Sequence, residues 1–454
     1  MYILDFRSKV IHWNAERGFY GRSLFNINRA DVVSVYGIQD HLTNEEDIYF
    51  FPETRIKSFQ KTIRHLGSVT ITYEKDCSGY SLRNEQGQYL CSEAHTFRFS
   101  RDAVSSWETF IFIDDDFIER LDHLTSNQWI SKRTGDMLDV EHIQYLDDFL
   151  IRIGGFMIDI RSQQVNDFGK YRTILFHENW KPEVFLLYSP VIYITAFSSD
   201  DVLNQLKLCV SSIRRFGNYT GKIIVMTDRS LAYIQELCGE YDTDFLDTDT
   251  LHPSDFVGYV CSKYYILDKP IYRGHQPLLY LDPDIIFDND LNVILKDALL
   301  SEEICAPFEK QSPLRTQPSV GSSLIQLDGL SVGTYAVGLN GGTIIFPNTE
   351  NPETYDFIKL VRRTIRNVGT KYGRNFCHWA DQEVFNYMAV KLGLVNYTIL
   401  TRYANFISND PFDPYSKKGF VHFWGNSNKA EVMERYMKQL EEIERSRALH
   451  RVAD

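Results

Sequence analysis

Two aspartates, Asp282 and Asp284, directly follow one apolar stretch, LLYL, and directly precede another, IIF. One residue separates them, so both carboxylates project from the same side of an extended segment. Such a pair can ligate a hard divalent cation that also holds a diphosphate. The same spacing occurs at four other places: Asp114/Asp116, Asp242/Asp244, Asp247/Asp249 and Asp288/Asp290. We interpret those four as solvated turns and predict a metal site at Asp282 and Asp284.

A pair of glycines follows Asn340 between two apolar runs, VGL and TIIF. Glycines inside a strand mark either a bulge or a surface that a ligand approaches closely. The amide of Asn340 can bind sugar hydroxyls as donor and acceptor together. The stretch is therefore compatible with a structural bulge and with a sugar-binding surface, and by itself it favours neither.

Two further segments carry polar groups that could complete such a site. Asp381 and Gln382 are expected in the first turn of a helix, where acids also serve as caps favoured by the helix dipole. His422 lies in the aromatic stretch GFVHFWG, and Gly425 and Lys429 follow it. An imidazole on the metal, with a glycine amide and a lysine ammonium near phosphates, would complete a diphosphate site. The alternative for His422 is a hydrogen-bonded structural residue.

Apolar strands alternate with amphipathic helices from Val191 onward, which predicts an α/β layered domain. The expected strands are 191–197, 222–228, 277–287 and 337–346, and helices are expected from about Pro352 and through residues 379–393. A final helix carries one apolar face, expected to dock on the domain or on a partner: Val432, Met433, Tyr436, Met437, Leu440 and Ile443.

Residues 1–188 lack this alternation and contain short β-like stretches between turn-rich segments. We expect a β-rich accessory domain of unknown role over 1–188, followed by the α/β domain over 189–454, with the boundary at Ser189-Pro190. Two segments, 81–93 and 169–188, share a Gly-x-Tyr element and suggest a β-trefoil or lectin-like module.

The composition is that of a globular chain. With 454 residues, two domains are expected. Lys and Arg number 48 against 61 Asp and Glu, a net charge of −13 that argues against nucleic acid as a partner. No apolar run approaches the roughly 18 residues of a transmembrane segment, and the amino terminus does not resemble a signal peptide. Seven scattered cysteines without CxxC spacing indicate reduced thiols. We therefore expect a cytoplasmic protein, and homo-oligomerisation remains open.

Five motifs in order, Ser262-Lys263, LYLDPD, NGG, ADQE and HFWG, resemble glycosyltransferase family 8 over roughly Val191 to Glu434. This family comprises retaining GT-A enzymes that include glycogenin and the lipopolysaccharide galactosyl- and glucosyltransferases. The resemblance implies a Rossmann-like nucleotide-diphospho-sugar transferase domain. It further implies the transfer of a hexose from a UDP-sugar to a glycan, lipid-linked or protein hydroxyl, with Mn²⁺ or Mg²⁺ as cofactor.

The resemblance also implies roles for individual residues. Asp282, Asp284 and His422 would be the metal ligands. The residues implied to contact the donor are Thr195, Phe197 and Asp228 around the nucleobase and ribose, Lys263 against the sugar or phosphate, Asn340, Gly341, Asp381 and Gln382 at the sugar, and Gly425 and Lys429 at the diphosphate. The family usually places its last lysine three residues after the glycine and follows it with Pro-Trp. Here the sequence is GNSNKAE, which leaves the role of Lys429 open.

The family retains anomeric configuration. The resemblance implies Gln382 and Asp381 as the catalytic residues, with Gln382 nearest the anomeric carbon. Since no acid is obviously placed as a nucleophile, we favour same-face attack by the acceptor over a covalent intermediate. Other classes fit less well, because the chain has no GxxxxGK[ST] loop and no GxSxG elbow. Two alternatives remain: a sugar nucleotidyltransferase, although its Gly-rich loop is replaced by SSDDVL, and a non-catalytic glycan- or nucleotide-sugar-binding protein.

Overall fold

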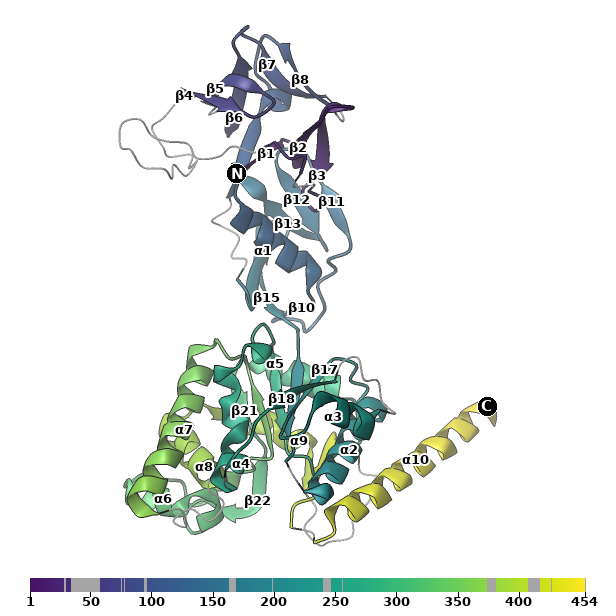
Figure 1. The fold of residues 1–454 in the computed structure, drawn as a ribbon, viewed down its shortest axis with the longest axis vertical. Coiled ribbons are helices and arrows are strands. Elements are labelled where there is room, and N and C mark those ends of the chain that lie inside the picture. The colour runs from purple at the N-terminus through teal and green to yellow at the C-terminus, as the bar shows by residue number, and fades with distance from the viewer. Residues whose placement is uncertain are drawn as a thin grey trace. The chain divides into compact units, whose positions relative to one another are not determined.

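The computed structural model describes residues 1–27, 30–33, 58–74, 76, 78–93, 96–162, 169–197, 199–239, 246–254, 256–373, 381–406, 417–425 and 427–453. The chain divides into two compact units, Met1–Leu187 and Tyr188–Asp454 (Figure 1). The division lies beside the Ser189-Pro190 step. None of the helices in these residues is long and apolar enough to cross a membrane.

The first unit is built mainly of antiparallel sheet. Its larger sheet has nine strands in the order β4-β5-β6-β7-β8-β3-β2-β1-β9, and a further pairing of β6 with β9 closes part of it into a ring. The strands are β1 (Tyr2–Asp5), β2 (Lys9–Asn14), β3 (Gly18–Ser23), β4 (Ser58–Ile63), β5 (Gly67–Glu74), β6 (Gly79–Asn84), β7 (Tyr89–Glu93), β8 (Thr96–Arg101) and β9 (Phe110–Ile113).

A second, six-stranded sheet completes this unit in the order β10-β15-β14-β13-β12-β11. Its strands are β10 (Trp129–Ser131), β11 (Ile143–Tyr145), β12 (Leu150–Ile153), β13 (Phe156–Asp159), β14 (Arg172–Phe176) and β15 (Pro182–Leu187). The helix α1 (Asp115–Ser126) buries Phe117, Ile118, Leu121 and Leu124 in a core shared with both sheets. Two short 3₁₀ turns, Ser106–Glu108 and Ile160–Ser162, connect these elements. The expected β-rich domain is thus observed.

The trefoil interpretation of this unit was wrong. Residues 81–93, the first suggested repeat, belong to β6 and β7 of the nine-stranded sheet, whereas residues 169–188 include β14 and β15 of the six-stranded sheet. Equivalent repeats of a trefoil would occupy equivalent places around a single barrel. The first Gly-x-Tyr element lies in the tight turn between β6 and β7, where Gly87 has a φ of +84°.

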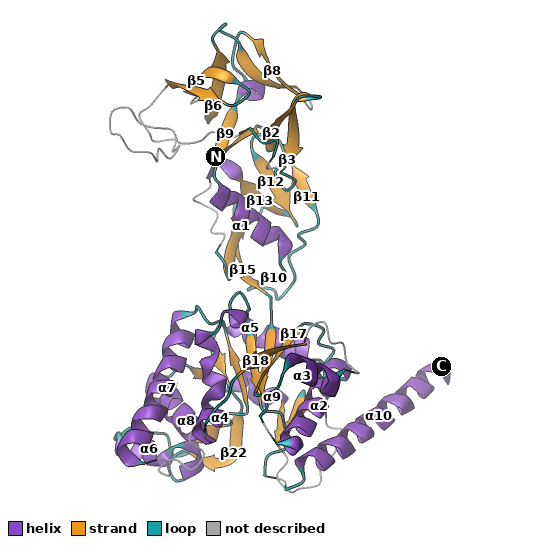
Figure 2. Ribbon diagram, in the orientation of Figure 1, coloured by secondary structure: helices purple, strands orange, loops and turns teal. Residues whose placement is uncertain are grey.

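The second unit is mixed α/β, as expected. Its main sheet has the order β18-β17-β16-β19-β24-β21-β25, and the four strands from β18 to β19 run parallel. The strands are β16 (Val191–Thr195), β17 (Lys222–Thr227), β18 (Leu246–Thr250), β19 (Leu278–Leu281), β21 (Ile304–Cys305), β24 (Thr343–Phe346) and β25 (Val395–Asn396). Every residue of β19 and β24 is buried, because helices lie on both sides of the sheet (Figure 2).

Two small sheets flank this one: β20 (Ile285–Phe287) with β27 (Phe420–His422) and β26 (Ala404–Phe406), and β22 (Phe308–Pro313) with β23 (Val337–Leu339). The helices are α2 (Asp200–Arg215), α3 (Leu231–Cys238), α4 (Phe256–Cys261), α5 (Leu291–Ser301), α6 (Ser322–Leu327), α7 (Pro352–Tyr372), α8 (Asp381–Leu392), α9 (Thr398–Tyr403) and α10 (Lys429–Ala453), and 3₁₀ turns cover Ser262–Asp268, Pro270–Tyr272 and Pro318–Val320. The helix expected from about Pro352 is therefore confirmed as α7.

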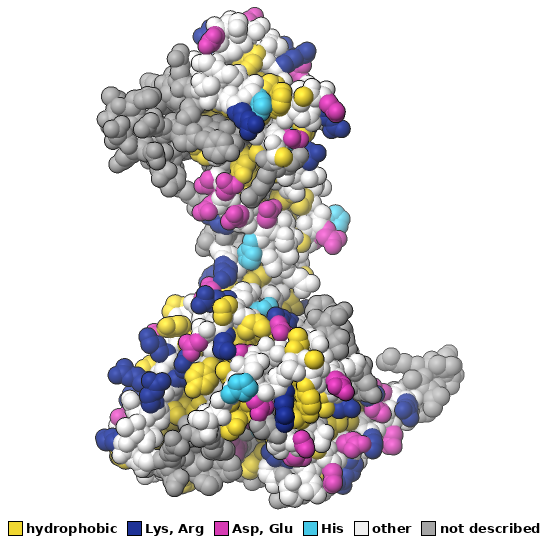
Figure 3. Space-filling view, in the orientation of Figure 1, with side chains coloured by type: hydrophobic (Ala, Val, Ile, Leu, Met, Phe, Trp, Pro, Cys, Tyr) yellow, Lys and Arg dark blue, Asp and Glu magenta, His cyan; other side chains and the backbone are white. Residues whose placement is uncertain are grey.

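The helix α7 shows how charge is distributed on an acidic chain. Its apolar residues, among them Phe357, Val361 and Ile365, are buried in the core of the unit. Its exposed residues include Arg363 and Arg366, and Lys and Arg side chains gather over this part of the molecule (Figure 3). Although the chain has a net charge of −13, the exposed face of α7 is therefore locally basic.

The final helix, α10, docks on its own unit. Of the two expected docking surfaces, the domain itself and a partner, the structure shows the domain. Met433, Tyr436, Met437 and Leu440 are buried against Phe216, Ile286, Val421 and Phe423. The hydroxyl of Tyr436 also donates to the carboxylate of Asp288 at 2.8 Å. The apolar face of α10 thus covers the small sheet that contains β20 and β27.

Candidate active site

The turn between β19 and β20 positions the two aspartates. The parallel strands end at the same edge of the main sheet, which is where ligands bind in open α/β sheets. Asp282 directly follows β19, and its backbone N–H donates to the carbonyl of Gly342 at 2.7 Å. Asp284 directly precedes β20, which pairs with β27 so that Ile285 lies opposite His422. Strand register therefore brings His422 to Asp284 across 138 residues of sequence.

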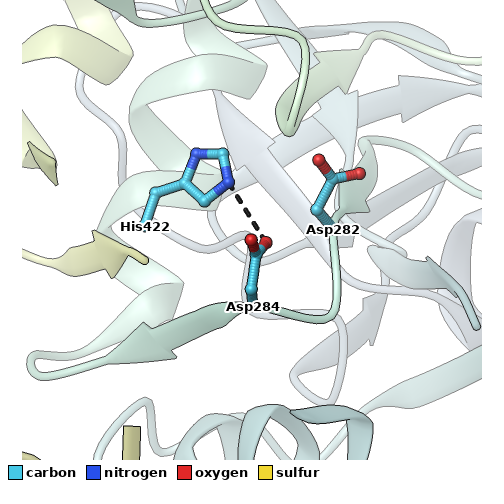
Figure 4. Close-up of side chains that lie close together, drawn as sticks. All are labelled: Asp282, Asp284 and His422. Atoms are coloured by element: carbon cyan, nitrogen blue, oxygen red, sulfur yellow. Dashed lines mark ion pairs between the residues drawn. The ribbon is translucent and has the colours of Figure 1, made fainter. Parts of the chain in front are cut away.

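Asp282, Asp284 and His422 form a cluster that could hold a metal ion. One ligand atom from each residue lies within 4.8 Å of the others, and the three side chains converge from two elements (Figure 4). The Nε2 atom of His422 is 3.1 Å from Oδ1 of Asp284. Asp284 and His422 are each 4% exposed. Burial raises the pKa of Asp284, but the charges of His422 and Lys429 outweigh it and hold that pKa below its usual value.

The donor atoms of the cluster fit a divalent ion. Oδ1 of Asp284 is buried and has no hydrogen-bond partner despite its proximity to His422. Such an atom is costly unless a cation or a donor compensates it. Two carboxylates and an imidazole form a mixed oxygen and nitrogen set, which suits first-row divalent metals such as Mn²⁺. The three residues could therefore hold the metal that the sequence motifs imply.

The second glycine of the NGG motif is required by this crowding. A Cβ on Gly342 would lie 2.6 Å from Cε1 of His422 and 2.8 Å from Oδ2 of Asp282. No side chain fits at those distances, so Gly342 allows the backbone to pass directly beside the cluster. Gly341 has more space, with the nearest atoms at 3.7 Å. The motif is thus a site of close approach at its second glycine.

Lys263 provides a buried cation beside the cluster. Its ammonium is 2.7 Å from Oδ2 of Asp381 and 3.9 Å from Oδ1 of Asp282, and it donates to the carbonyl of Gly341 at 2.9 Å. Burial lowers the pKa of Lys263, but Asp381 and Asp282 outweigh that effect and raise it, so the amine stays charged. The ammonium also lies 4.5 Å from the centre of the Tyr280 ring. This one residue therefore connects three of the predicted site segments.

Gln382 is held at both ends of its amide. Its Oε1 accepts from the N–H of Gly341 at 3.1 Å, and its Nε2 donates to Glu309 at 2.9 Å. One turn later Asn386 exchanges two hydrogen bonds with the backbone of Leu339, at 2.6 and 2.9 Å. These bonds fix the start of α8 against β23 and its following loop. The expected placement of Asp381 and Gln382 in a first helical turn is observed.

Glu309 was not found by sequence reasoning. This carboxylate on β22 is 7% exposed and accepts a hydrogen bond from Nε2 of Gln382 at 2.9 Å. Burial raises the pKa of Glu309, against the opposing effects of His422 and of the nearby polar side chains of Gln382, Ser312 and Asn340. The segment FEKQSP resembles an ordinary polar strand, and the partner Gln382 lies 73 residues away. The available signal was the apolar run ICAPF directly before the acid, which parallels LLYL before Asp282.

The other predicted donor residues lie around this group. Oγ1 of Thr195 is 2.9 Å from the hydroxyl of Tyr280, which in turn bonds to Asp282. Phe197 packs on Tyr259 with 5.2 Å between ring centres. Asp228 directly follows β17, and its carboxylate is 3.9 Å from Arg229. Gly425 lies in a turn with a φ of +78°. The ammonium of Lys429 is 2.6 Å from Oδ2 of Asp284. Most of the predicted donor residues are thus joined by these contacts to the cluster of Asp282, Asp284 and His422. No such contact is described for Phe197 and Asp228, which follow strand ends, or for Gly425, which lies in a turn.

No family model matches the chain, and no curated protein matches it by sequence. Similar solved structures include the galactosyltransferase LgtC in complex with donor and acceptor sugar analogs, with 16% identity and a TM-score of 0.41 over 56% of this chain and 95% of that chain. Mouse xyloside xylosyltransferase 1 shows 11% identity and a TM-score of 0.39 over 52% and 98% of the two chains. The glycosyltransferase GlyE of Streptococcus pneumoniae shows 17% identity and a TM-score of 0.37 over 55% of this chain and 60% of that chain. All three are glycosyltransferases.

Proposed function

We propose that the second unit is a metal-dependent, retaining glycosyltransferase of the GT-A type that moves a hexose from a UDP-sugar to a hydroxyl acceptor. The observation that carries this proposal is the convergence of Asp282, Asp284 and His422 at the carboxyl edge of a parallel sheet. A metal bound there would neutralise charge on the departing diphosphate, the main electrostatic demand of the reaction. Asn340 and Gln382, beside the cluster, are the polar groups that we assign to the donor sugar.

We assign different roles to the two lysines of the site, Lys429 and Lys263. Lys429 begins α10 at the rim of the cluster with its side chain 30% exposed, so we assign it to the phosphates, together with the amide of Gly425. Lys263 is buried among Asp381, Asp282 and Gly341, and we assign its charge to stabilising the two buried carboxylates rather than to binding the donor. We assign Phe197 and Asp228, at the ends of two neighbouring parallel strands, to the nucleoside.

Retention of configuration is assigned to same-face attack by the acceptor hydroxyl. Gln382 is a poor nucleophile, and both ends of its amide are engaged by Gly341 and Glu309. Glu309 itself is buried and accepts a hydrogen bond from Gln382, which lowers the nucleophilicity of its carboxylate. The base for the acceptor proton is then the leaving phosphate. Isolation of an enzyme with a glycosylated side chain would contradict this assignment.

The acceptor and the role of the first unit are assigned more broadly. We propose a glycan, lipid-linked or protein hydroxyl as acceptor, and an accessory role for Met1–Leu187. The five cysteines among the described residues, Cys91, Cys209, Cys238, Cys261 and Cys305, are free and buried, while Cys77 and Cys377 lie outside those residues. Free thiols support the proposed cytoplasmic location.

The first test is a thermal-shift screen of UDP, GDP, UDP-glucose, UDP-galactose and UDP-N-acetylglucosamine, each with and without Mn²⁺. A ligand that binds the native state raises the melting temperature with the logarithm of its excess over Kd. We expect a shift with uridine nucleotides that requires Mn²⁺. A nucleotidyltransferase would instead respond to a nucleoside triphosphate and release pyrophosphate when supplied with a sugar phosphate.

Two matched variants make this screen specific to the site. Asp284→Asn removes one predicted ligand and should abolish the Mn²⁺-dependent shift and reduce sugar transfer or donor hydrolysis about 10²-fold or more. Asp116→Asn makes the same change in another Asp-x-Asp, at an exposed position of α1, and should leave both unchanged. Wild-type behaviour of Asp284→Asn would overturn the metal assignment, and nucleotide binding without turnover on any acceptor would favour the binding-protein alternative.

A further inference from the structure

The first unit contains a cavity that is lined by residues from both of its sheets. It has a volume of about 430 Å³ and is lined by Arg7, Lys9, Gly21, Ser23, Tyr145 and Asp147. Lys9 begins β2, Gly21 and Ser23 belong to β3, and Tyr145 ends β11 of the six-stranded sheet. This volume is within the range of cavities that hold small molecules. None of these residues takes part in the candidate active site.

A buried carboxylate fixes the turn that carries the two cations of the cavity. Asp5 is fully buried, and its Oδ1 atom accepts the backbone N–H groups of Arg7 and Lys9 at 3.0 and 2.8 Å. Its Oδ2 atom accepts the hydroxyl of Ser92 at 2.5 Å. Donors inside the protein therefore satisfy this carboxylate. The turn between β1 and β2 is thus held in place before any ligand binds, which lowers the entropic cost of binding.

Aromatic rings, rather than a close ion pair, orient the guanidinium of Arg7. Its Cζ atom lies 4.9 Å from the ring centre of Phe6 and 5.6 Å from that of Trp107. Nε of Arg7 is 3.6 Å from Oδ1 of Asp147, whose side chain is 79% exposed. This separation is too long for a hydrogen bond, and exposed ion pairs contribute little to stability. Arg7 can therefore exchange this ion pair for a carboxylate or a phosphate, which guanidinium groups bind through two parallel hydrogen bonds.

The other polar groups of the cavity suit a ligand with hydroxyls. The hydroxyls of Ser23 and Tyr145 hydrogen-bond to each other across the two sheets, and hydroxyls both donate and accept. The carboxylate of Asp147 accepts hydrogen bonds from hydroxyls but repels a simple anion. The rings of Tyr145 and Trp107 are 37% and 41% exposed, and each offers an apolar face to a sugar ring. A ligand that combines one acidic group with several hydroxyls would satisfy all of these groups.

We propose that this cavity binds an acidic saccharide, a sugar unit that bears a carboxylate or a phosphate. Arg7 and Lys9 bind the acidic group, and Asp147 binds sugar hydroxyls together with Ser23 and Tyr145. Because two cations face one carboxylate in the lining, the cavity favours a ligand of net negative charge over a neutral sugar. The inference does not depend on the proposed transfer reaction, since every residue in it belongs to the first unit.

Isothermal titration calorimetry of the full chain tests the ligand class with four probes: glucuronate, glucose 6-phosphate, glucose and inorganic phosphate. We expect an acidic sugar to bind, and glucose and phosphate to bind about tenfold more weakly or less, because each lacks one set of the hydrogen bonds. The tighter of the two acidic sugars identifies the acidic group. Equal affinity for glucose would contradict the role of the cations, and equal affinity for phosphate would show a site for the anion alone. No binding of either acidic sugar would overturn the proposal.

Matched substitutions connect this binding to the cavity. Arg7→Met and Lys9→Met each remove one positive charge and keep an unbranched side chain, and each should weaken binding of the acidic sugar about tenfold or more. Arg17→Met makes the same change at an exposed position in the turn between β2 and β3 and should leave the affinity unchanged. Melting temperatures verify the fold, and Lys9→Met decides the matter if Arg7→Met is destabilised by lost packing on Phe6. Wild-type affinity in both cavity variants would place the binding elsewhere and overturn the proposal.

Discussion

At the scale of single residues, the site depends on charges that are buried together. Lys263 places one ammonium between Asp381, Asp282 and the carbonyl of Gly341. Lys263→Met would leave the buried carboxylate of Asp381 without its cation, and breaking such a pair typically costs about 3–5 kcal/mol. Lys359→Met removes an exposed lysine of α7 and should change stability by less than about 0.5 kcal/mol. Urea unfolding measures both, and equal effects would contradict the structural role of Lys263.

Glu309 should give the chain a specific pH dependence. Its folded-state pKa is raised by burial, so above that pKa the folded protein bears the cost of a buried charge. As the pH falls from about 7 to about 4, the folded state binds this proton before the unfolded state does. The wild type should therefore gain stability relative to Glu309→Gln over that range. Melting temperatures of the two proteins at successive pH values provide the measurement, and a constant or opposite difference would exclude the raised pKa.

Residue types and local pattern predicted the residues of the candidate metal cluster but not the buried polar groups that pack beside it. Asp282 and Asp284 were identified because their spacing and flanking strands are local signals. Glu309 was not, because its hydrogen bond is with Gln382, which comes from a distant segment. Thr195 shows the same limit: its contact with Tyr280 arises from the pairing of β16 with β19, which a single sequence does not specify.

At the scale of elements, helix α10 should be a major source of stability for the second unit. Leu440 is fully buried against the small sheet and the end of α2. Leu440→Ala should cost about 2–5 kcal/mol, because it leaves a cavity in a packed interface. Lys438→Ala, on the exposed face with an ion pair to Glu434, should cost less than about 1 kcal/mol. Urea denaturation of both variants tests the docking of the helix, and similar losses would show that the apolar face is not packed as described.

The elements also show where periodicity is informative. The strands expected at 191–197, 222–228 and 337–346 are present as β16, β17, and β23 with β24. Most of their residues are buried whether the pairing is parallel, as in β16 and β17, or antiparallel, as in β24, and strands covered on both faces give continuous apolar runs. The stretch 277–287 was expected as one strand running into a turn, and it forms β19 and β20 in different sheets. The first unit was predicted only as β-rich, because antiparallel pairing between β3 and β8, or β1 and β9, joins segments far apart in sequence.

At the scale of the whole molecule, each unit has its own hydrophobic cores. The buried clusters of the described residues contain members either from Met1–Leu187 or from Tyr188–Asp454, and none contains both. Such units are expected to unfold separately. Calorimetry of the full chain should therefore show two transitions, of which Leu440→Ala lowers one and Leu121→Ala, in the core of the first unit, lowers the other.

Manganese should raise only the transition that Leu440→Ala lowers. All three predicted ligands belong to the second unit, so binding stabilises that unit alone. At about 100 times Kd the gain is about 2.7 kcal/mol, which corresponds to a rise of about 5–10 °C for a unit of this size. Asp284→Asn should abolish the rise and Asp116→Asn should keep it. A rise in the other transition would place the principal manganese site in the first unit, and a single transition that rises with Mn²⁺ would indicate that the two units unfold as one.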